Sequence, residues 1–170
     1  LDRGFRLGFV GSGDSHDGHP GLAHLGGPSG GVAAILAPEL TRDAVRAALF
    51  ERRVYATNGP RIVLRATLGG EPMGAVLPVG GDGRLAAELE VTVMATAPVA
   101  RVEVIRSGRV VESALGEGLE DLAMTLPLEG LRPGEYVYLR VVQEDGGAAW
   151  SSPWFVAENG RATTGGREEA

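Results

Sequence analysis

The chain has 170 residues, a formal net charge of −6 and no cysteine. The acidic balance excludes electrostatic binding to nucleic acid or to an anionic membrane, because both need a basic surface. The lack of cysteine excludes disulfides, a thiolate nucleophile and thiolate ligands for zinc.

No apolar run reaches the roughly 18 residues that a membrane-spanning helix needs, so we expect a soluble protein without a membrane partner. The chain begins at Leu1 without a methionine, in what resembles the approach to a strand. We therefore expect a fragment whose true N-terminus is absent, and the compartment stays unknown. All basic residues are arginine, which we interpret as a bacterial-like bias of composition.

The first third of the chain has the order of an α/β unit. Phe5–Val10 is an apolar run that predicts a buried strand, and residues 11–30 form a long loop rich in glycine. Gly31–Pro38 is apolar without alternation, which is typical of a strand covered on both faces. Strand, loop, strand and then helix is typical of α/β architecture.

A helix is predicted over the stretch LTRDAVRAALFERR, residues 40–53. Thr41 is a good N-cap residue, because its hydroxyl can accept a hydrogen bond from a free backbone N–H of the first turn. Leu40 and Val45 occupy the two positions of a hydrophobic staple.

The pattern changes after residue 60, where apolar and polar residues begin to alternate. Period two predicts antiparallel strands with one buried face, and Ser107-Gly108 predicts a hairpin turn. About seven short strands follow from this pattern, which favours an antiparallel β-sandwich over residues 61–157. Residues 1–60 form a separate unit in this interpretation, and 158–170 are predicted to be a disordered tail.

The loop after the first strand contains the stretch GSGDSHDGHPG, residues 11–21, and all three histidines of the chain lie in residues 16–24. Asp14 and His16 are two residues apart, so a continuing strand would point both side chains the same way, as a metal pair requires. A catalytic metal usually needs three protein ligands or more.

Two other interpretations stay open for this loop. Gly-Asp-Ser after a strand is also found in a class of serine esterases, and Ser15 would then be the nucleophile. That chemistry needs a histidine base from a distant part of the chain, and no histidine follows His24. An ordinary polar loop explains the composition without any chemistry.

The loop, the following GVAAILAPELTRDAVRAALFERRVYATNGPRI, Met73-Gly74 and the closing VVQEDGGAAWSSPWFV together resemble one protein family. This is the C-terminal part of a metal-dependent hydrolase of the PHP (polymerase and histidinol phosphatase) superfamily, in a poorly characterised branch with a trailing β-rich domain. The resemblance implies an α+β fold, in which the C-terminal remnant of a distorted (β/α) PHP barrel is followed by the sandwich.

The same resemblance implies a function. Asp14 and His16 match the last metal motif of the family, so the intact protein would hold divalent metal ions (Zn, Mn or Fe). A metal-activated water would hydrolyse a small phosphorylated substrate, as a phosphoesterase does. The further metal motifs lie upstream in the family and are absent here. We therefore expect the fragment alone to be inactive, with the missing N-terminal barrel portion as its partner.

Five other residues are candidates for lining that site, although none matches a metal motif of the family: His19, His24, Tyr55, Asn58 and Arg61. The alternative function is a non-catalytic accessory or binding module, in which the sandwich recognises a partner or a glycan. The aromatic residues Tyr136, Tyr138, Trp150 and Trp154 could form a platform for a sugar. We favour core or interdomain packing for them, because aromatic side chains dominate core burial.

Overall fold

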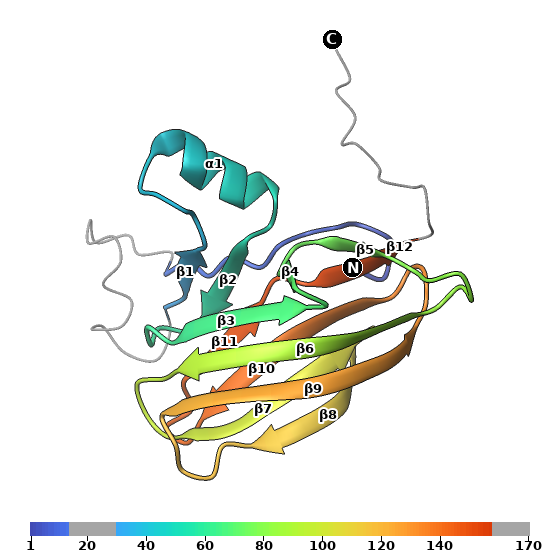
Figure 1. Ribbon diagram of the computed structural model, residues 1–170. Helices are drawn as coiled ribbons and strands as arrows, with labels where there is room; N and C mark the ends of the chain where they lie inside the picture. Colours follow the sequence, from blue (N-terminus) through green and yellow to red (C-terminus); the bar gives the residue numbers. More distant parts are fainter. Residues whose placement is uncertain (14–29, 158–170) are drawn as a thin grey trace.

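Alternating apolar residues in the second half of the chain form the antiparallel strands that they predict. The computed structural model describes residues 1–13 and 30–157 (Figure 1). In the small sheet, the strand order is β4 (Glu71–Pro72), β3 (Val63–Leu68), β6 (Leu85–Met94) and β9 (Asp121–Leu131). Leu89, Val91 and Val93 of β6 are buried while the residues between them are exposed, so one face of this sheet covers the core.

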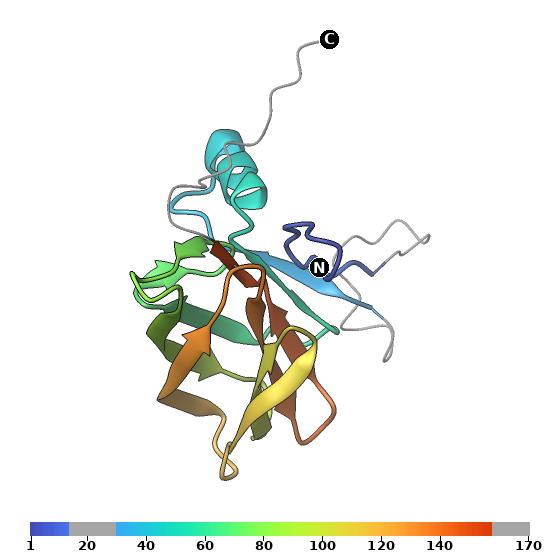
Figure 2. The same ribbon diagram turned by 90° about the vertical axis from the view of Figure 1, so that its right-hand side faces the viewer.

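The large sheet is built around β10 (Tyr136–Gln143). One side of β10 pairs with β7 (Val99–Arg106), which pairs in turn with β8 (Arg109–Leu115). The other side pairs with β11 (Ala148–Ser151) and then with β12 (Trp154–Ala157). The two sheets pack face to face as a β-sandwich (Figure 2).

Side chains from both sheets interdigitate in the core. Val137, Leu139 and Val141 of β10 are fully buried, and so is Trp154. The indole N–H of Trp154 donates to the carbonyl oxygen of Glu71 at 2.9 Å, which satisfies the one polar atom of this ring. The predicted preference of Trp154 for core packing is confirmed.

The last strand is interrupted between β11 and β12 by Ser152 and Pro153. Proline has no backbone N–H to donate to the ladder, so pairing breaks at this point. Beyond the break, β12 pairs in parallel with β5 (Val76–Pro78), which closes the edge of the large sheet. Ser151 bonds across to β10, because its hydroxyl accepts from the backbone N–H of Leu139 at 2.9 Å.

The other edge of the large sheet carries the part of the chain that was expected to be a barrel remnant. β2 (Val54–Thr57) pairs with β11, and β1 (Val32–Ile35) pairs with β2. Both pairings are antiparallel, whereas a (β/α) barrel needs parallel strands joined by crossover helices. The expected α+β fold with a PHP barrel remnant is therefore wrong. The strands of this region extend the sandwich.

Helix α1 (Arg42–Phe50) connects β1 to β2 and begins as predicted. The hydroxyl of Thr41 accepts a hydrogen bond from the N–H of Ala44 at 3.3 Å, so Thr41 is the N-cap. The expected hydrophobic staple is wrong, because Leu40 is 97% exposed and packs on nothing.

Two more expectations for the first forty residues are wrong. Residues 5–10 are extended but pair with no strand, and Phe5, Leu7 and Val10 are each more than half exposed. The strand β1 is an edge strand with half-buried residues, not a strand covered on both faces. An apolar run alone therefore did not distinguish a central strand from a segment that lies on a sheet.

Candidate functional site

The described residues on the two sides of the loop that was predicted to hold a metal lie beside β1. The N–H of Gly31 donates to the carbonyl oxygen of Ser12 at 3.1 Å, so the described residues on its two sides are in contact. A Cβ on Gly11 would lie 2.9 Å from the carbonyl oxygen of Thr57, the last residue of β2. The backbone at Gly11 therefore passes too close to β2 for a side chain to fit.

The predicted metal ligands Asp14 and His16, the alternative nucleophile Ser15, and the candidates His19 and His24 all lie outside the described residues. Their roles stay predictions. Within residues 1–13 and 30–157, no group of three or more histidine, aspartate or glutamate side chains could hold a metal ion.

The other candidates for site lining have different surroundings. Tyr55 is buried, and its hydroxyl donates to the carbonyl oxygen of Ile62 at 2.8 Å and accepts from the N–H of Leu64 at 3.1 Å. Burial raises the pKa of this phenol. Tyr55 thus ties β2 to the start of β3.

Asn58 holds the turn between β10 and β11. Its side-chain N–H donates to the carbonyl oxygen of Gly146 at 3.0 Å, and its side-chain oxygen accepts from the N–H of Ala148 at 2.7 Å. Arg61 is exposed at the start of β3. Of the three candidates in the described part of the chain, Tyr55 and Asn58 bond to backbone groups. Among the described residues, no hydrogen bond joins the Arg61 side chain to either of them.

An extended stretch, residues 1–12, crosses the outer face of the large sheet and is here called the N-terminal segment. The hydroxyl of Ser152 accepts from the N–H of Phe9 at 3.0 Å. The ring of Phe9 meets that of Tyr138 edge to face, with 5.1 Å between the centroids. At the other end of the segment, Tyr136 donates to the carboxylate of Asp2 at 2.8 Å.

A cavity of about 330 Å³ lies under the first residues of the N-terminal segment. Phe5 and Arg6 form one wall, and Tyr136, Phe155 and Val156 form the other. Burial, followed by the hydrogen bond and the negative charge of Asp2, raises the pKa of Tyr136 to about 12. The phenol therefore stays protonated and keeps donating to Asp2 throughout the physiological range of pH.

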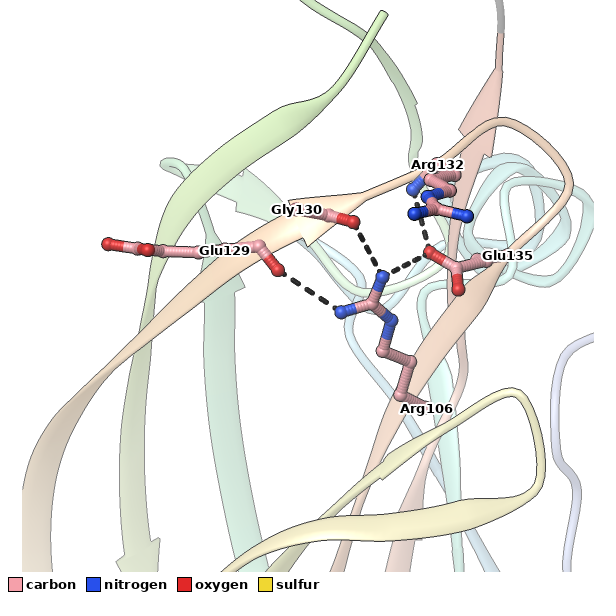
Figure 3. A network of polar contacts seen from close by, with 5 residues as sticks. All are labelled: Arg106, Glu129, Gly130, Arg132 and Glu135. Carbon is pink, nitrogen blue, oxygen red and sulfur yellow. Dashed lines mark hydrogen bonds and ion pairs between the residues drawn. The ribbon is translucent and has the colours of Figure 1, made fainter.

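A polar network fixes the turn between β9 and β10, and part of this turn lines the cavity (Figure 3). The guanidinium of Arg106 donates to the carbonyl oxygens of Glu129 at 3.1 Å and Gly130 at 2.6 Å, and to the carboxylate of Glu135 at 2.6 Å. The same carboxylate accepts from the N–H of Arg132 at 2.7 Å. Arg106 thereby ties the large sheet, through β7, to the small sheet, through β9.

The C-terminal end of α1 packs on the turn between β4 and β5. The Nε of Arg52 donates to the carbonyl oxygen of Gly74 at 2.9 Å, and its guanidinium lies 5.8 Å from the centre of the Phe155 ring. A second cavity, of about 260 Å³, lies between these parts. Arg52, just beyond the C-cap of the helix, thus ties this end of α1 to the sandwich.

Exposed large apolar side chains are most numerous in the first fifty residues of the chain, among those that the structure describes. We call the N-terminal segment, β1 and α1 together with the turn that precedes α1 the N-terminal layer. Figures 1 and 2 both place α1 and β1 at the edge of the large sheet opposite β8, whereas the N-terminal segment crosses the sheet from Tyr136 toward that edge. Seven side chains of this layer are exposed: Phe5, Leu7, Val10, Ile35, Leu40, Leu49 and Phe50.

Outside this layer, the outer face of the large sheet carries an ion-paired cluster that the sequence analysis did not identify. Glu103 of β7 accepts from Arg101 at 2.9 Å and also from Arg140 of β10. The signal that could have revealed it is the period of two, which places Arg101 and Glu103 on one face of β7 and Arg140 on one face of β10. The pairing of β7 with β10 was not predictable from either strand alone.

No described helix is long and apolar enough to cross a membrane. Residues 22–77 match a family described as "Protein of unknown function (DUF3604)". An uncharacterized protein of Chlamydia pneumoniae is 35% identical over 77% of this chain and 23% of its own length. An uncharacterized protein of Chlamydia trachomatis is 32% identical over the same shares. The chain thus spans about a quarter of the length of the curated relatives it matches.

Among solved structures, the chain is similar to a fibronectin(III)-like module of Clostridium thermocellum CbhA. The two are 17% identical with a TM-score of 0.34, over 55% of this chain and 96% of that module. The expected resemblance to the PHP superfamily is wrong. The matching family is one of unknown function, the matching relatives are uncharacterized, and β1 and β2 are antiparallel.

Proposed function

We propose that this chain is a non-catalytic β-sandwich module that packs through its N-terminal layer against another part of a longer polypeptide. The observation that carries the proposal is the number of large exposed apolar side chains in that layer. Seven of the twelve exposed large apolar residues among the described residues belong to it. Large exposed apolar side chains concentrated in one part of a protein are typical of an interaction surface.

The construction of the layer supports the same function. Among the residues of α1, only Ala48 is buried, so the helix contributes little to the core. Even so, its end is fixed to the sandwich through Arg52 and Gly74. A short helix that adds little to the core but is held in one orientation is suited to presenting Leu49 and Phe50 to a partner surface.

The lengths of the relatives support the kind of partner. The matching Chlamydia proteins extend well beyond the part that this chain matches, since it covers 23% of each. A neighbouring part of the same polypeptide is present at high effective concentration, so a modest apolar surface suffices to hold it. Interfaces between domains of one chain bury roughly 600–1,500 Å².

Hydrogen exchange tests the proposal directly. Backbone amide exchange is compared between the isolated 170-residue chain and a longer polypeptide that contains it. Amides of the N-terminal segment and of α1 should exchange more slowly in the longer polypeptide, because docking suppresses local opening. Amides of β8 serve as the internal control and should exchange equally in both. Equal exchange of the N-terminal layer in the two proteins contradicts the proposal.

Matched surface variants separate docking from general stickiness. Leu7→Ser with Phe50→Ser removes apolar side chains from the layer, and Val110→Ser with Val111→Ser removes two from β8. The first pair should abolish the extra protection seen in the longer polypeptide, whereas the second pair should leave it unchanged. Loss of protection with the β8 pair alone would place the interface elsewhere.

A further inference from the structure

A row of polar and aromatic side chains crosses the outer face of the large sheet. Val137, Leu139 and Val141 point into the core, so Arg140 points to the opposite face. Arg140 stands directly opposite Glu103 on β7 and opposite Trp150 on β11. Directly paired residues lie about 5 Å apart on the same face of a sheet, so the three side chains are neighbours.

The two arginines of this row are held in a specific way. Each donates its Nε to a different oxygen of Glu103, which is only 9% exposed. The terminal nitrogens of both guanidinium groups have no hydrogen-bond partner within residues 1–13 and 30–157. The side chains of Arg101 and Arg140 are 42% and 37% exposed. A buried carboxylate therefore orients the guanidinium groups of two partly exposed arginine side chains.

The charges of this cluster do not cancel. Two guanidinium groups share one carboxylate, which leaves a net charge of +1 in a protein whose total is −6. Arginine donors in a fixed orientation bind planar carboxylates through two parallel hydrogen bonds, and pre-orientation lowers the entropy that binding costs. The cluster is thus suited to a carboxylate ligand.

Trp150 adds an aromatic side chain on β11, the strand on the other side of Arg140 from Glu103. It is partly exposed, whereas Trp154, the other tryptophan, is fully buried. On its other side Trp150 stands opposite Ala56, whose side chain is small. Its ring N–H has no hydrogen-bond partner among the described residues. A partly exposed indole on the strand next to an oriented arginine suits a ligand with a flat or apolar ring face and an acidic group.

We propose that Trp150, Arg140, Arg101 and Glu103, here called the arginine row, bind a sugar that carries a carboxylate, such as a uronic acid residue of an acidic glycan. The carboxylate accepts hydrogen bonds from the terminal nitrogens of Arg140 and Arg101. The sugar ring lies against Trp150. Glu103 is a positioning residue, because it holds both guanidinium groups without contacting the ligand.

The experiment is an NMR titration of the isotopically labelled chain with glucuronate. The two tryptophans give two indole N–H signals, and a Trp150→Phe variant assigns them. Glucuronate should shift the Trp150 signal with a dissociation constant of about 1–10 mM, as is usual for a single weakly held sugar unit. The signal of the buried Trp154 should stay in place. Glucose and acetate, which each lack one half of the ligand, should bind at least tenfold more weakly.

Two arginine variants and one control complete the test. Arg101→Gln and Arg140→Gln should each weaken binding about tenfold, the loss expected for one charged hydrogen-bonded pair. Arg65→Gln removes an exposed strand arginine from the small sheet and should leave binding unchanged. If Arg140→Gln fails to fold, Arg101→Gln still decides, because its loss leaves Glu103 paired with Arg140.

Three outcomes would overturn the proposal. The first is a Trp150 signal that does not respond to about 50 mM glucuronate. The second is an equal response to glucose, which would mean that the arginines contribute nothing. The third is an equal response to inorganic phosphate or acetate, which would reduce the arginine row to a general anion site without sugar recognition.

Discussion

Tyr55 illustrates how a single polar atom can connect the two sheets of this sandwich. Its ring lies in the core with β2, while its hydroxyl bonds to backbone groups of residues 62 and 64 at the start of β3. These backbone groups have little access to water. A buried donor or acceptor that loses its partner costs roughly 1–3 kcal/mol.

Tyr55→Phe is therefore expected to lower the free energy of unfolding by about 1–3 kcal/mol, because it leaves the N–H of Leu64 and the carbonyl of Ile62 without their partner. Urea denaturation followed by fluorescence measures the change. Tyr138→Phe is the matched control, since the Tyr138 ring packs on Phe9 and no described residue bonds to its hydroxyl. An equal loss in both variants would assign the effect to the ring environment.

We expect Glu103 to make the stability of the protein depend on pH. Its hydrogen bond with Arg140 and then that with Arg101 outweigh burial and hold the pKa of the carboxyl below its usual value. A carboxyl with a lower pKa in the folded state stabilises the fold above its unfolded pKa, about 4.3. That stabilisation is lost as the pH falls through the folded pKa.

Glu103→Gln should reduce the loss of stability below about pH 5 and lower stability at pH 7 by roughly 1–2 kcal/mol, since both arginines are partly exposed and screened by solvent. Urea midpoints measured from pH 3 to pH 7, a range set around the unfolded pKa, provide the test. Glu88→Gln, on the exposed face of β6, is the control. If the urea midpoint of the Glu103→Gln variant changed with pH as steeply as that of the natural protein, the ion pairs of Glu103 would not contribute to the pH dependence of stability.

The predicted metal ligands Asp14 and His16 call for a direct measurement. Isothermal titration with Mn²⁺ and Zn²⁺, beside an Asp14→Ala/His16→Ala double variant, tests them. Two ligands alone bind weakly, so we expect the isolated chain to bind either ion no tighter than about millimolar. Micromolar binding that the double variant abolishes would mean that further ligands complete a site within this chain.

At the scale of elements, the junction between α1 and the β4–β5 turn depends on the absence of a side chain at Gly74. Its φ is +90°, a left-handed conformation that other residues rarely adopt. A Cβ at this position would lie 2.6 Å from the carbonyl oxygen of Arg52 and closer still to that of Glu51. The Met73-Gly74 pair thus marks the site where the helix meets the sandwich.

Gly74→Ala should destabilise the protein by about 2–4 kcal/mol. One part of this loss is the cost of an alanine in the left-handed conformation, and the other part is the steric clash of its Cβ. Gly70→Ala measures the conformational cost alone, because Gly70 has a φ of +80° and nothing lies within 4 Å of the added Cβ. Thermal unfolding of the two variants measures both. Equal losses of stability in the two variants would mean that the junction between the helix and the turn relaxes and removes the steric clash.

The elements themselves were largely predictable, because each depends on its own stretch of sequence. Thr41 at the helix start, the turn at Ser107-Gly108 and the alternation in β6 all predict the observed structure. The direction of pairing was not predictable. β1, α1 and β2 follow the order of a parallel unit, and only the partners that β2 finds in β11 and β1 reveal an antiparallel edge.

The candidate site divides in the same way. Local composition singled out Asp14 and His16, which lie beyond the described residues, while Tyr55 and Asn58 proved to contact backbone groups. The arginine row was missed because its members come from three strands. Residues 101, 140 and 150 meet only through the register of β7, β10 and β11, and a single sequence does not encode register locally.

At the scale of the whole molecule, the region before residue 60 and the sandwich share hydrogen bonds and a core. We therefore expect a single unfolding transition, because β2 is laddered to β11 and Tyr55 belongs to the core cluster. Urea unfolding followed by tryptophan fluorescence and by far-UV circular dichroism should give coincident curves. Two separated transitions would instead support independent units on either side of residue 60.

The place of β2 in the large sheet has a consequence for synthesis. Its partner β11 begins at Ala148, about 90 residues after β2 ends. At roughly 5–20 residues per second, a ribosome needs about 5–20 seconds to supply that partner. Throughout this interval β1, α1 and β2 have no completed sheet to join, and their apolar side chains are open to chaperones or to a neighbouring part of the same nascent polypeptide. A preceding domain that had already folded would be the first surface they meet.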